Sequence, residues 1–332
     1  MQELFIALKN KWGILKYFFL TDAIILVSFT QNKFLFITLF ILTASIGCYF
    51  IALGGSITEF RPSLTVLRNT DLDHILNHNK PNEKLILPFL LGLDNKKKAI
   101  FYDLITAKHV LITGKSGKGK SNFIAQFILS LLKEYKNNLA LFLCDFKKVE
   151  LADYKNLKQV AMADSQEELK KVTEMLIQEM KDRYTLFLEV PKGQRTFKSL
   201  AAYNAANPTN QMAYALLLID EFADVEDPAI WEDIKTLLRE GRGAGILIAL
   251  ATQIATKEAG LQPAIKRLIT TYISFGVGND SHLSGTKGSE DLKIGEFIIN
   301  SEEFSNQRIL AAYVGEKDKT YTEVLKKYEK EI

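Results

Sequence analysis

One stretch of eight residues constrains the fold more than any other part of the chain. It reads Gly114-Lys115-Ser116-Gly117-Lys118-Gly119-Lys120-Ser121 and matches the pattern G-x-x-x-x-G-K-[ST] at every fixed position. The apolar, β-branched run His109–Thr113 comes before it and predicts a buried strand. The spacing of apolar residues in Asn122–Lys133, just after it, predicts a helix. A strand, a glycine-rich turn and a helix in this order predict a phosphate-binding loop.

The residue types in this loop explain how it would hold phosphate. Glycines at 114, 117 and 119 allow backbone N–H groups to turn inward, which makes an anion-binding concavity at the start of a helix. Lys120 would bring a positive charge to the β- and γ-phosphates, and the Ser121 hydroxyl would be a ligand for Mg²⁺. We therefore expect all eight residues to bind ATP together with Mg²⁺. A chance glycine-rich turn is the alternative, and the flanking strand and helix argue against it.

Size and composition set broad limits. At 332 residues the chain can hold one large domain or two ordinary ones. Its net charge of +3 is too small to indicate nucleic-acid binding, so any such contact must come from local basic patches. The two cysteines, Cys48 and Cys144, lie in apolar runs and indicate neither a disulfide framework nor a metal site. A reducing cytosolic setting fits the main domain.

The first 60 residues predict a membrane anchor. Phe34–Leu53 contains 20 residues without a charge, which is long enough to cross a bilayer as a helix. Ile14–Phe29 is also apolar but contains Lys16 and Asp22. We expect two antiparallel transmembrane helices, at about 14–30 and 34–53, and an interfacial helix is the alternative for the first. A cleaved signal peptide fits less well, because the apolar region is too long.

The charges that flank the two predicted spans predict their orientation. Lys9 and Lys11 precede the first span, and Arg61 and Arg68 follow the second. Because basic residues favour the cytoplasmic side, both ends of this hairpin should face the cytoplasm. We therefore expect a multi-pass protein of the cell membrane whose ATP-binding part is cytoplasmic.

The rest of the chain divides into three parts. Residues 61–104 form a polar connector with prolines and two short predicted strands, Leu85–Leu93 and Ile100–Leu104. Residues 105–315 would be the ATP-binding domain, and residues 316–332 a charged C-terminal helix.

Strands and helices alternate after residue 105. Further buried strands are predicted at Leu139–Cys144, Ala215–Ile219, Ile246–Ala251 and Tyr272–Val277. A helix is predicted over Ser165–Leu188, with Ser165 as its N-cap and Glu168 completing a capping box. This alternation predicts an α/β fold with a mostly parallel sheet covered by helices on both faces.

Two acids follow one of these strands. Asp220 and Glu221 directly succeed the apolar run Ala215–Ile219, the pattern called Walker B. Asp220 would hold Mg²⁺, and Glu221 would polarise the water that attacks the γ-phosphate. A strand that merely ends in surface acids is the alternative. Gln253 ends the next strand and would orient the water or sense the γ-phosphate, unless it only closes that strand.

Several basic residues are candidates for phosphate or DNA contacts. Arg239 and Arg242 lie around a glycine-rich turn, where they would reach the phosphate of the same or a neighbouring subunit, or a DNA backbone. A basic helix end capped by glycine is the alternative. Two further groups are candidates for DNA contacts, with a solvated charged surface as the alternative: Lys257, Lys266 and Arg267, and Lys192, Arg195 and Lys198.

Together these motifs resemble the FtsK/SpoIIIE family of DNA-pumping ATPases over about residues 105–300. Besides the phosphate loop, the segments that carry the resemblance are Asp145–Leu151 (D-P-K-x-x-E-L, with Phe146 in place of proline), Met180–Tyr184 (M-x-x-R-Y), Leu218–Asp224 (I-D-E-F-A-D), Gly241–Gly245 (G-R-A-A-G) and Ala251–Gln253 (A-T-Q). The resemblance implies a RecA-like P-loop NTPase that hydrolyses ATP, contacts DNA mostly without regard to sequence and assembles as a ring, most often a hexamer.

The chain departs from the family in one functional motif. The family's P-[ST]-R segment corresponds to Thr270-Thr271-Tyr272, so the arginine that would act across a subunit boundary is absent there. Arg242 and Arg267 are the alternatives for that role.

The layout narrows the expected function. A membrane hairpin joined to one motor domain resembles the TcpA-like coupling ATPases of conjugative elements in Gram-positive bacteria. That implies DNA transfer of a plasmid or integrative element, with relaxosome or conjugation-channel proteins as partners. The alternatives are an ATPase of a protein-secretion or phage-assembly machine, and an adaptor that uses nucleotide only as an assembly switch.

Overall fold

The computed structural model describes residues 70–135, 138–189, 196–253, 263–276, 285–289, 291–315, 323 and 326. The chain divides into two compact units, Met1–Leu64 and Thr65–Ile332, and all described residues belong to the second. Both predicted transmembrane helices, at 14–30 and 34–53, lie outside the described residues. Among the helices within these ranges, none is both long and apolar enough to span a membrane.

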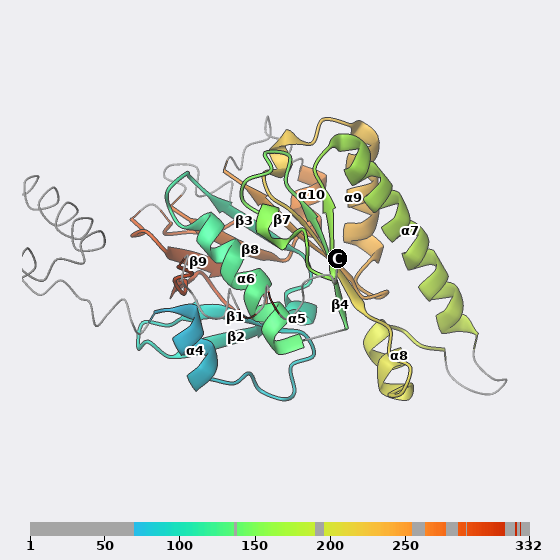
Figure 1. The fold of residues 1–332 in the computed structure, drawn as a ribbon, viewed down its shortest axis with the longest axis horizontal. Coiled ribbons are helices and arrows are strands. Elements are labelled where there is room, and N and C mark those ends of the chain that lie inside the picture. Colours follow the sequence, from blue (N-terminus) through green and yellow to red (C-terminus); the bar gives the residue numbers. More distant parts are fainter. Residues whose placement is uncertain are drawn as a thin grey trace, which may run out of the picture. The chain divides into compact units, whose positions relative to one another are not determined.

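Ten strands of the described part form one sheet (Figure 1). From one edge to the other their order is β2-β1-β10-β9-β8-β3-β7-β6-β4-β5. Their bounds in chain order are β1 Pro88–Leu93, β2 Ala99–Asp103, β3 Val110–Gly114, β4 Leu139–Cys144, β5 Val160–Ala163, β6 Tyr214–Ile219, β7 Ile246–Thr252, β8 Thr271–Phe275, β9 Glu296–Asn300 and β10 Gln307–Leu310.

The sheet is mixed, and this qualifies the prediction of a mostly parallel one. The six strands β8, β3, β7, β6, β4 and β5 run parallel to their neighbours. The remaining pairings, from β8 through β9, β10 and β1 to β2, are antiparallel. Parallel strands need long crossovers, whereas β1 and β2 are joined by a short turn at Asp94–Lys98, so this edge is built from hairpins.

Residues of the predicted connector take part in this sheet. β1 lies within the predicted strand Leu85–Leu93, and β2 nearly coincides with Ile100–Leu104. All six residues of β1 are buried, and β1 pairs with β10 as well as with β2. Residues 88–103 are therefore an edge of the central sheet rather than a separate linking segment.

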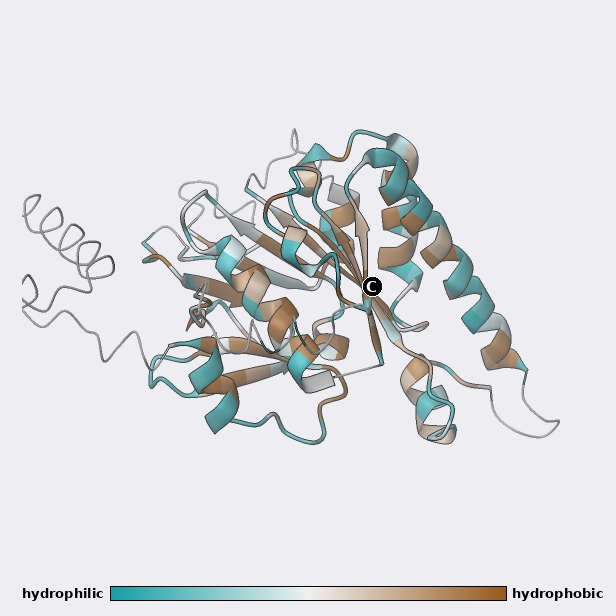
Figure 2. Cartoon of the chain, viewed as in Figure 1, coloured by the Kyte–Doolittle hydropathy of each residue, from teal (hydrophilic) through white to brown (hydrophobic). Residues whose placement is uncertain are grey.

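Helices cover both faces of the sheet (Figure 1). Their bounds are α4 Leu72–His78, α5 Leu104–Ala107, α6 Lys120–Tyr135, α7 Gln166–Leu188, α8 Leu200–Ala206, α9 Pro228–Glu240 and α10 Pro263–Leu268. Apolar residues of α4 and α6 share a core with Val110 and Ile112 of β3, whereas those of α7, α9 and α10 share one with Leu111. Successive residues of β3 thus point to opposite faces, as the period of two requires. In Figure 2 the central strands are mostly hydrophobic, and the covering helices carry both hydrophobic and hydrophilic residues.

The long helix α7 begins where the sequence predicts. The Ser165 side chain accepts the N–H of Glu168, as an N-cap does. The Glu168 carboxylate accepts the N–H of Asp164 rather than that of Ser165, so the predicted capping box closes one residue earlier. Of residues 316–332, for which a helix is predicted, the structure describes only Glu323 and Lys326, and both are helical.

Candidate nucleotide site

The loop between β3 and α6 is built for close approach. Gly114, the last residue of β3, pairs with Phe275 of β8. A Cβ at Gly114 would lie 2.7 Å from the Phe275 Cβ, so no larger residue fits without a shift. Gly117 and Gly119 have φ values of 74° and 110°, which glycine adopts at little cost. Gly114 thus allows the close packing of β3 against Phe275, and Gly117 and Gly119 allow the backbone conformation of the loop.

The other loop residues differ in burial. Lys115, Ser116 and Gly117 are exposed, and Lys118, Gly119 and Ser121 are half-buried. Lys120 is buried in the first turn of α6, where only 7% of its surface is exposed. Ser121 follows it in the same turn.

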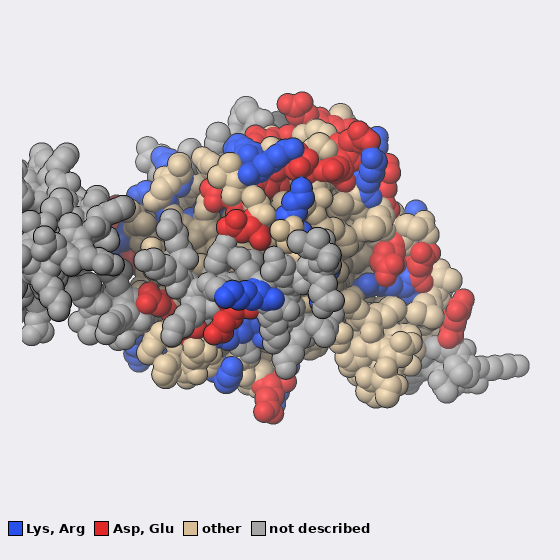
Figure 3. All heavy atoms as spheres, viewed as in Figure 1, with Lys and Arg blue, Asp and Glu red and all other residues tan. Residues whose placement is uncertain are grey.

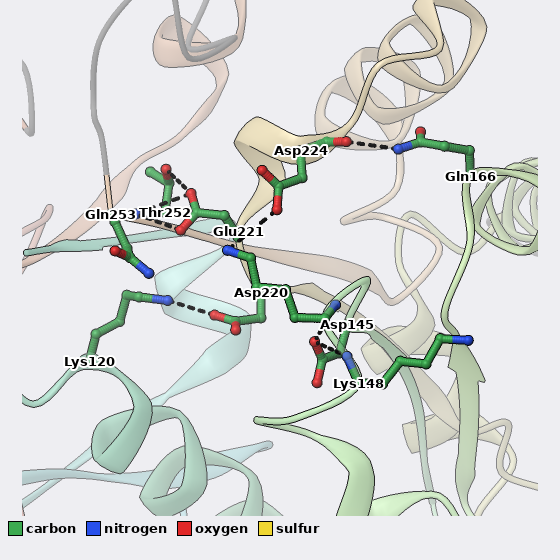
Figure 4. Close-up of polar contacts among 10 residues, drawn as sticks. Lys120, Asp145, Lys148, Gln166, Asp220, Glu221, Asp224, Thr252 and Gln253 are labelled. Carbon is green, nitrogen blue, oxygen red and sulfur yellow. Dashed lines mark hydrogen bonds and ion pairs between the residues drawn. The ribbon is translucent and has the colours of Figure 1, made fainter. Parts of the chain in front are cut away.

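Lys120 forms a buried ion pair with Asp220. The distance between Lys120 Nζ and Asp220 Oδ1 is 2.6 Å, and each side chain is 7% exposed (Figure 4). Asp220 directly follows β6, and its N–H donates to the carbonyl of Cys144 in β4. The carboxyl ends of the parallel strands β3, β7, β6 and β4 lie on the same side of the sheet. Lys120 and Asp220, which are 100 positions apart in sequence, can therefore meet there.

The oxygen ligands at this site suit Mg²⁺. The described residues contain no group of three or more His, Cys, Asp or Glu side chains that could hold a metal ion. Mg²⁺ does not need such a group, because it is usually bound by one or two carboxylates, water and the phosphates of the substrate. The Asp220 carboxylate beside the Ser121 turn is a donor set of this kind.

Glu221 takes a different direction from Asp220. Its backbone is left-handed, with φ 60° and ψ 63°, which costs a residue other than glycine about 1–2 kcal/mol. Its carboxylate accepts the Thr252 hydroxyl at 2.6 Å and the N–H of Gln253 at 3.1 Å. Figure 4 shows the Glu221 carboxylate turned toward β7, whereas that of Asp220 is turned toward Lys120. The left-handed residue thus separates the two adjacent acids.

The end of β7 completes the site. Thr252 is fully buried, and Gln253 is exposed. Figure 4 shows the Gln253 carboxamide pointing toward the Lys120 ammonium. Thr252 stands inside the A-T-Q motif but is not among the site residues predicted from the sequence. Its position directly before Gln253, which is predicted to belong to the site, is the feature of the sequence that could have indicated it.

The Asp145 motif organises a neighbouring loop. The buried Asp145 carboxylate accepts the backbone N–H groups of Lys147, Lys148, Val149 and Leu151 at 2.9–3.1 Å. Lys148 has a φ of 56°, so the loop turns sharply around the carboxylate. The motif therefore has a structural role here. Burial and nearby carboxylates, first among them Asp145, raise the pKa of the adjacent Cys144 thiol to about 12, so the thiol stays protonated.

The M-x-x-R-Y motif fixes the glycine-rich turn before β7. Arg183 of α7 donates to the carbonyl of Ala244 at 2.7 Å, and the Tyr184 hydroxyl donates to that of Glu240 at 2.5 Å. These two hydrogen bonds thus dock α7 against the segment that connects α9 to β7.

Arg239 and Arg242 lie near the amino end of β7, opposite the carboxyl ends of the parallel strands. They are exposed residues at the end of α9 and directly after it, before β7 begins. The phosphate loop follows the carboxyl end of β3, which runs parallel to β7, and seven strand residues span about 20 Å. This position argues against contact with phosphate of the same chain, and the contacts of Arg239 and Arg242 with DNA or a neighbouring subunit stay predictions.

The other basic candidates are placed in part. Arg267 and Lys198 are exposed, and Lys266 is half-buried, which lowers the pKa of its ammonium group. Lys192, Arg195 and Lys257 lie outside the described residues. Acidic residues dominate the region where α7 and α9 begin, with Glu167 and Glu168 in the first turn of α7 and Glu226 and Asp227 before α9. Figure 3 shows acidic side chains gathered there, at the upper right of the view. This region is unsuited to a polyanion.

Solved structures share this fold. The pCW3 conjugation coupling protein TcpA, in a monomer form with ATPγS, superposes with a TM-score of 0.61 and 21% identity, covering 74% of this chain and 71% of that one. The cytoplasmic domain of the type VII secretion ATPase EccC from Thermomonospora curvata superposes with a TM-score of 0.64 and 21% identity, covering 76% of this chain and 32% of that one. The predicted P-loop ATPase fold is therefore confirmed.

Sequence comparison gives the family. DNA translocase FtsK of Chlorobaculum tepidum is 30% identical over 285 residues, which cover 79% of this chain and 34% of that protein. For DNA translocase FtsK of Oceanobacillus iheyensis the identity is 29% over 220 residues, 63% of this chain and 28% of that protein. The chain thus spans about a third of the length of these curated relatives. The FtsK/SpoIIIE family model matches residues 72–273, which is more than half of the chain. The resemblance in the motifs is confirmed, and the chain belongs to the FtsK/SpoIIIE family.

Proposed function

We propose that this protein is an ATP-driven motor that moves DNA. The observation that carries the proposal is the buried Lys120–Asp220 ion pair beside a phosphate-binding loop, in a domain of the FtsK/SpoIIIE family. Burying two charges is costly unless each has a partner, and an isolated structural role would be served as well by apolar residues. A phosphate-binding lysine beside an acid that holds Mg²⁺ accounts for both charges.

The side chains divide the hydrolytic step among them. The loop amides and Lys120 would hold the β- and γ-phosphates, and Ser121 and Asp220 would hold Mg²⁺, which would supply charge neutralisation. Glu221 accepts a proton from the attacking water, whose oxygen bonds to the γ-phosphorus while the bond to the β–γ bridging oxygen breaks. A carboxylate has about four acceptor positions, so Glu221 can accept a proton while Thr252 and Gln253 hold it.

The DNA contacts would be mostly to phosphate, and hence independent of sequence. The candidate side chains are Arg239, Arg242, Lys257, Lys266 and Arg267. The exposed positions of Arg239, Arg242 and Arg267 support this role. Arg239 and Arg242 lie at and just after the end of α9, which has 13 residues and is about 20 Å long, so the length of the helix separates them from its acidic start.

The same proposal covers the cellular setting. The uncharged run Phe34–Leu53 supports a membrane anchor with the motor in the cytoplasm. Subunits would assemble as a ring, most simply a hexamer. The shared fold with a conjugation coupling protein supports a role in moving plasmid or integrative-element DNA, with relaxosome or channel proteins as partners.

A secretion ATPase is the second candidate. The shared fold with the type VII secretion ATPase EccC favours it, because the same motor can act on a polypeptide. Sequence identity of 30% to a DNA translocase makes DNA the first choice.

ATP hydrolysis by the full-length protein, with and without duplex and single-stranded DNA, tests the proposal. We expect DNA to raise the rate severalfold or more and Lys120→Ala to abolish turnover. Lys181→Ala is the control, because Lys181 is an exposed lysine of α7 outside the phosphate loop, and this variant should retain most activity. Hydrolysis that is indifferent to every form of DNA would contradict the proposal.

A further inference from the structure

The position of the acids sets the direction in which a bound nucleotide lies. In the proposed mechanism the γ-phosphate faces Lys120 and Asp220. Asp220 follows β6 and Thr252 ends β7, and both strands lie on one side of β3 in the sheet. The ribose and the base are attached to the α-phosphate, at the other end of the triphosphate. They therefore extend toward the side of β3 where β8, β9 and β10 lie.

Two segments on that side are bonded to the phosphate loop and to α6. The N–H of Gly295 donates to the carbonyl of Lys118 at 3.0 Å, and the carbonyl of Gly295 accepts the N–H of Ala311 at 2.8 Å. A Cβ on Gly119 would lie 3.1 Å from Gly295, so the segment touches the loop itself. Residues before β9 and after β10 thus meet beside the phosphate loop.

The second segment is held against the first turn of α6. Asn122, the residue after Ser121, donates to the carbonyl of Ala312 at 2.6 Å and accepts the N–H of Val314 at 2.8 Å. Between these two residues lies Tyr313, whose N–H donates to the carbonyl of Thr70 and whose carbonyl accepts the N–H of Leu72. The backbone at Tyr313 is therefore fixed by Thr70 and Leu72, and the residues before and after it are bonded to Asn122 in the first turn of α6.

Each of these segments exposes a large apolar side chain. Ile294, next to Gly295, is 74% exposed, and Tyr313 is 54% exposed. Six large hydrophobic side chains are exposed in the described part of the chain: Ile86, Val149, Met175, Leu188, Ile294 and Tyr313. Two of the six thus lie in the pair of segments that flank this end of the loop. An exposed aromatic ring on a fixed backbone is a suitable surface for stacking a base, because little conformational freedom is lost on binding.

We propose that Tyr313 and Ile294 form the subsite for the nucleobase and ribose of the bound nucleotide, with the base stacked on the Tyr313 ring. The proposal rests on the proposed function, since it needs a triphosphate in the loop. It adds the part of the ligand that the phosphate-binding residues do not contact. It also gives a physical reason for the two hydrogen bonds of Asn122, which set the position of Tyr313 relative to α6.

Calorimetric titration of the full-length protein with ATP, ADP and inorganic tripolyphosphate tests the subsite. Loss of base stacking weakens binding by about tenfold, so Tyr313→Ala should raise the Kd for ATP and ADP by about this factor. The Kd for tripolyphosphate should change less than about twofold, because that probe has no base. Tyr313→Phe should bind all three probes like the unchanged protein. Leu188→Ala is the control for loss of an exposed apolar side chain at the end of α7.

Two results would overturn the inference while leaving the proposed function intact. One is an unchanged Kd for ATP in Tyr313→Ala, and the other is an equal loss of ATP and tripolyphosphate binding. If the unchanged protein binds neither ATP nor tripolyphosphate, the proposed function fails as well. Photo-crosslinking with 8-azido-ATP does not depend on any substitution. We expect it to label the peptide that contains Ile294 or Tyr313, with protection by ATP, and label confined to other peptides would contradict the subsite.

Discussion

Glu221 is the site residue whose surroundings are most fully determined. Its left-handed backbone directs the carboxylate to the end of β7, where one hydroxyl and one backbone N–H donate to it. The energy of that backbone conformation, about 1–2 kcal/mol, is offset by these hydrogen bonds to a charged group, worth about 1.5–3 kcal/mol each. Thr252 is therefore a positioning residue, since it would act on the reaction only through Glu221.

Removing the Thr252 hydroxyl should slow hydrolysis more than it weakens binding. In Thr252→Val we expect kcat to fall about tenfold or more while the Kd for ATP stays within about twofold, because the phosphate loop is unchanged. Thr252→Ser keeps the hydroxyl and should restore most of the rate. Steady-state hydrolysis and nucleotide titration of the two variants measure the difference. Equal kcat values in the valine and serine variants would rule out a positioning role.

His109, at the start of β3, should make the stability of the fold depend on pH. Burial is the main cause that lowers the pKa of its imidazole to about 4, and the charges of Arg242 and Lys108 also lower it, against an opposing hydrogen bond with the backbone of Leu238. The folded state therefore binds the proton less readily than the unfolded state, whose histidine has a pKa of about 6.5. The unfolded state gains protons first as the pH falls below about 6.5, so stability is complete above that pH and is lost toward pH 4.

The expected loss from this group is about 2 kcal/mol between pH 7.5 and pH 5. Urea unfolding at the two pH values measures it in the unchanged protein and in His109→Gln, which cannot take up the proton. The drop should be smaller in His109→Gln by about that amount. His74→Gln, at an exposed histidine of α4, is the control and should leave the drop unchanged. An identical drop in all three proteins would refute the assignment.

At this scale the sequence predicts the site only in part. The meeting of Lys120 with Asp220 follows from two motifs whose strands end at one edge of a parallel sheet. The roles of Thr252 and Asp145 do not follow. The Thr252 hydroxyl donates to a carboxylate that a left-handed backbone directs, and Asp145 accepts backbone N–H groups whose directions are set only once the loop has folded. The separation of Arg239 and Arg242 from the phosphate loop follows from the direction of β7, which runs parallel to β3 and begins just after these arginines.

The turn between α9 and β7 is closely packed. Gly245 has a φ of 76°, and a Cβ there would lie 2.2 Å from Cδ2 of the buried Leu200 in α8. The N–H of Leu200 donates in turn to the carbonyl of Gly243. Together with Arg183 and Tyr184 of α7, these contacts join two helices to the start of one strand.

Gly245→Ala should therefore destabilise the fold more than an alanine at a glycine with open space. Gly288 is the matched control, because its φ of 82° is similar and no atom lies within 4 Å of a Cβ built on it. We expect about 1 kcal/mol for Gly288→Ala from the backbone alone, and about 1–3 kcal/mol more for Gly245→Ala from overpacking. Thermal or urea unfolding of both variants measures the difference. Equal destabilisation would show that Leu200 moves aside freely.

The predictability of the elements follows their burial and length. Most residues of β3, β4, β6, β7 and β8 are buried, and each strand lies within two residues of its predicted bounds. β5 and β10 have four residues each and include exposed positions, and these two strands and β9 were not predicted. Such short strands are defined by pairing with neighbours far away in sequence, and local patterns carry little of that information.

For the molecule as a whole, the sheet explains how the parts of the proposed motor are arranged. The carboxyl ends of the parallel strands carry the phosphate loop and both acids, and the amino end of β7 follows the turn with Arg239 and Arg242. The antiparallel extension from β9 to β10 brings Ile294 and Tyr313 to the remaining side of the loop. The sequence predicts the first of these three groupings; the other two depend on strand order, which only the fold supplies.

The central claim, that ATP hydrolysis moves DNA, is tested most directly by displacement of a third strand from a DNA triplex. The full-length protein in lipid nanodiscs would be mixed with duplex DNA carrying a labelled third strand, and release of that strand would be followed after ATP is added. We predict release with ATP by the unchanged protein and by Lys181→Ala, and none by Lys120→Ala or with ATPγS. Hydrolysis of ATP by the unchanged protein without any release of the third strand, on duplex and single-stranded flanks alike, would contradict the account.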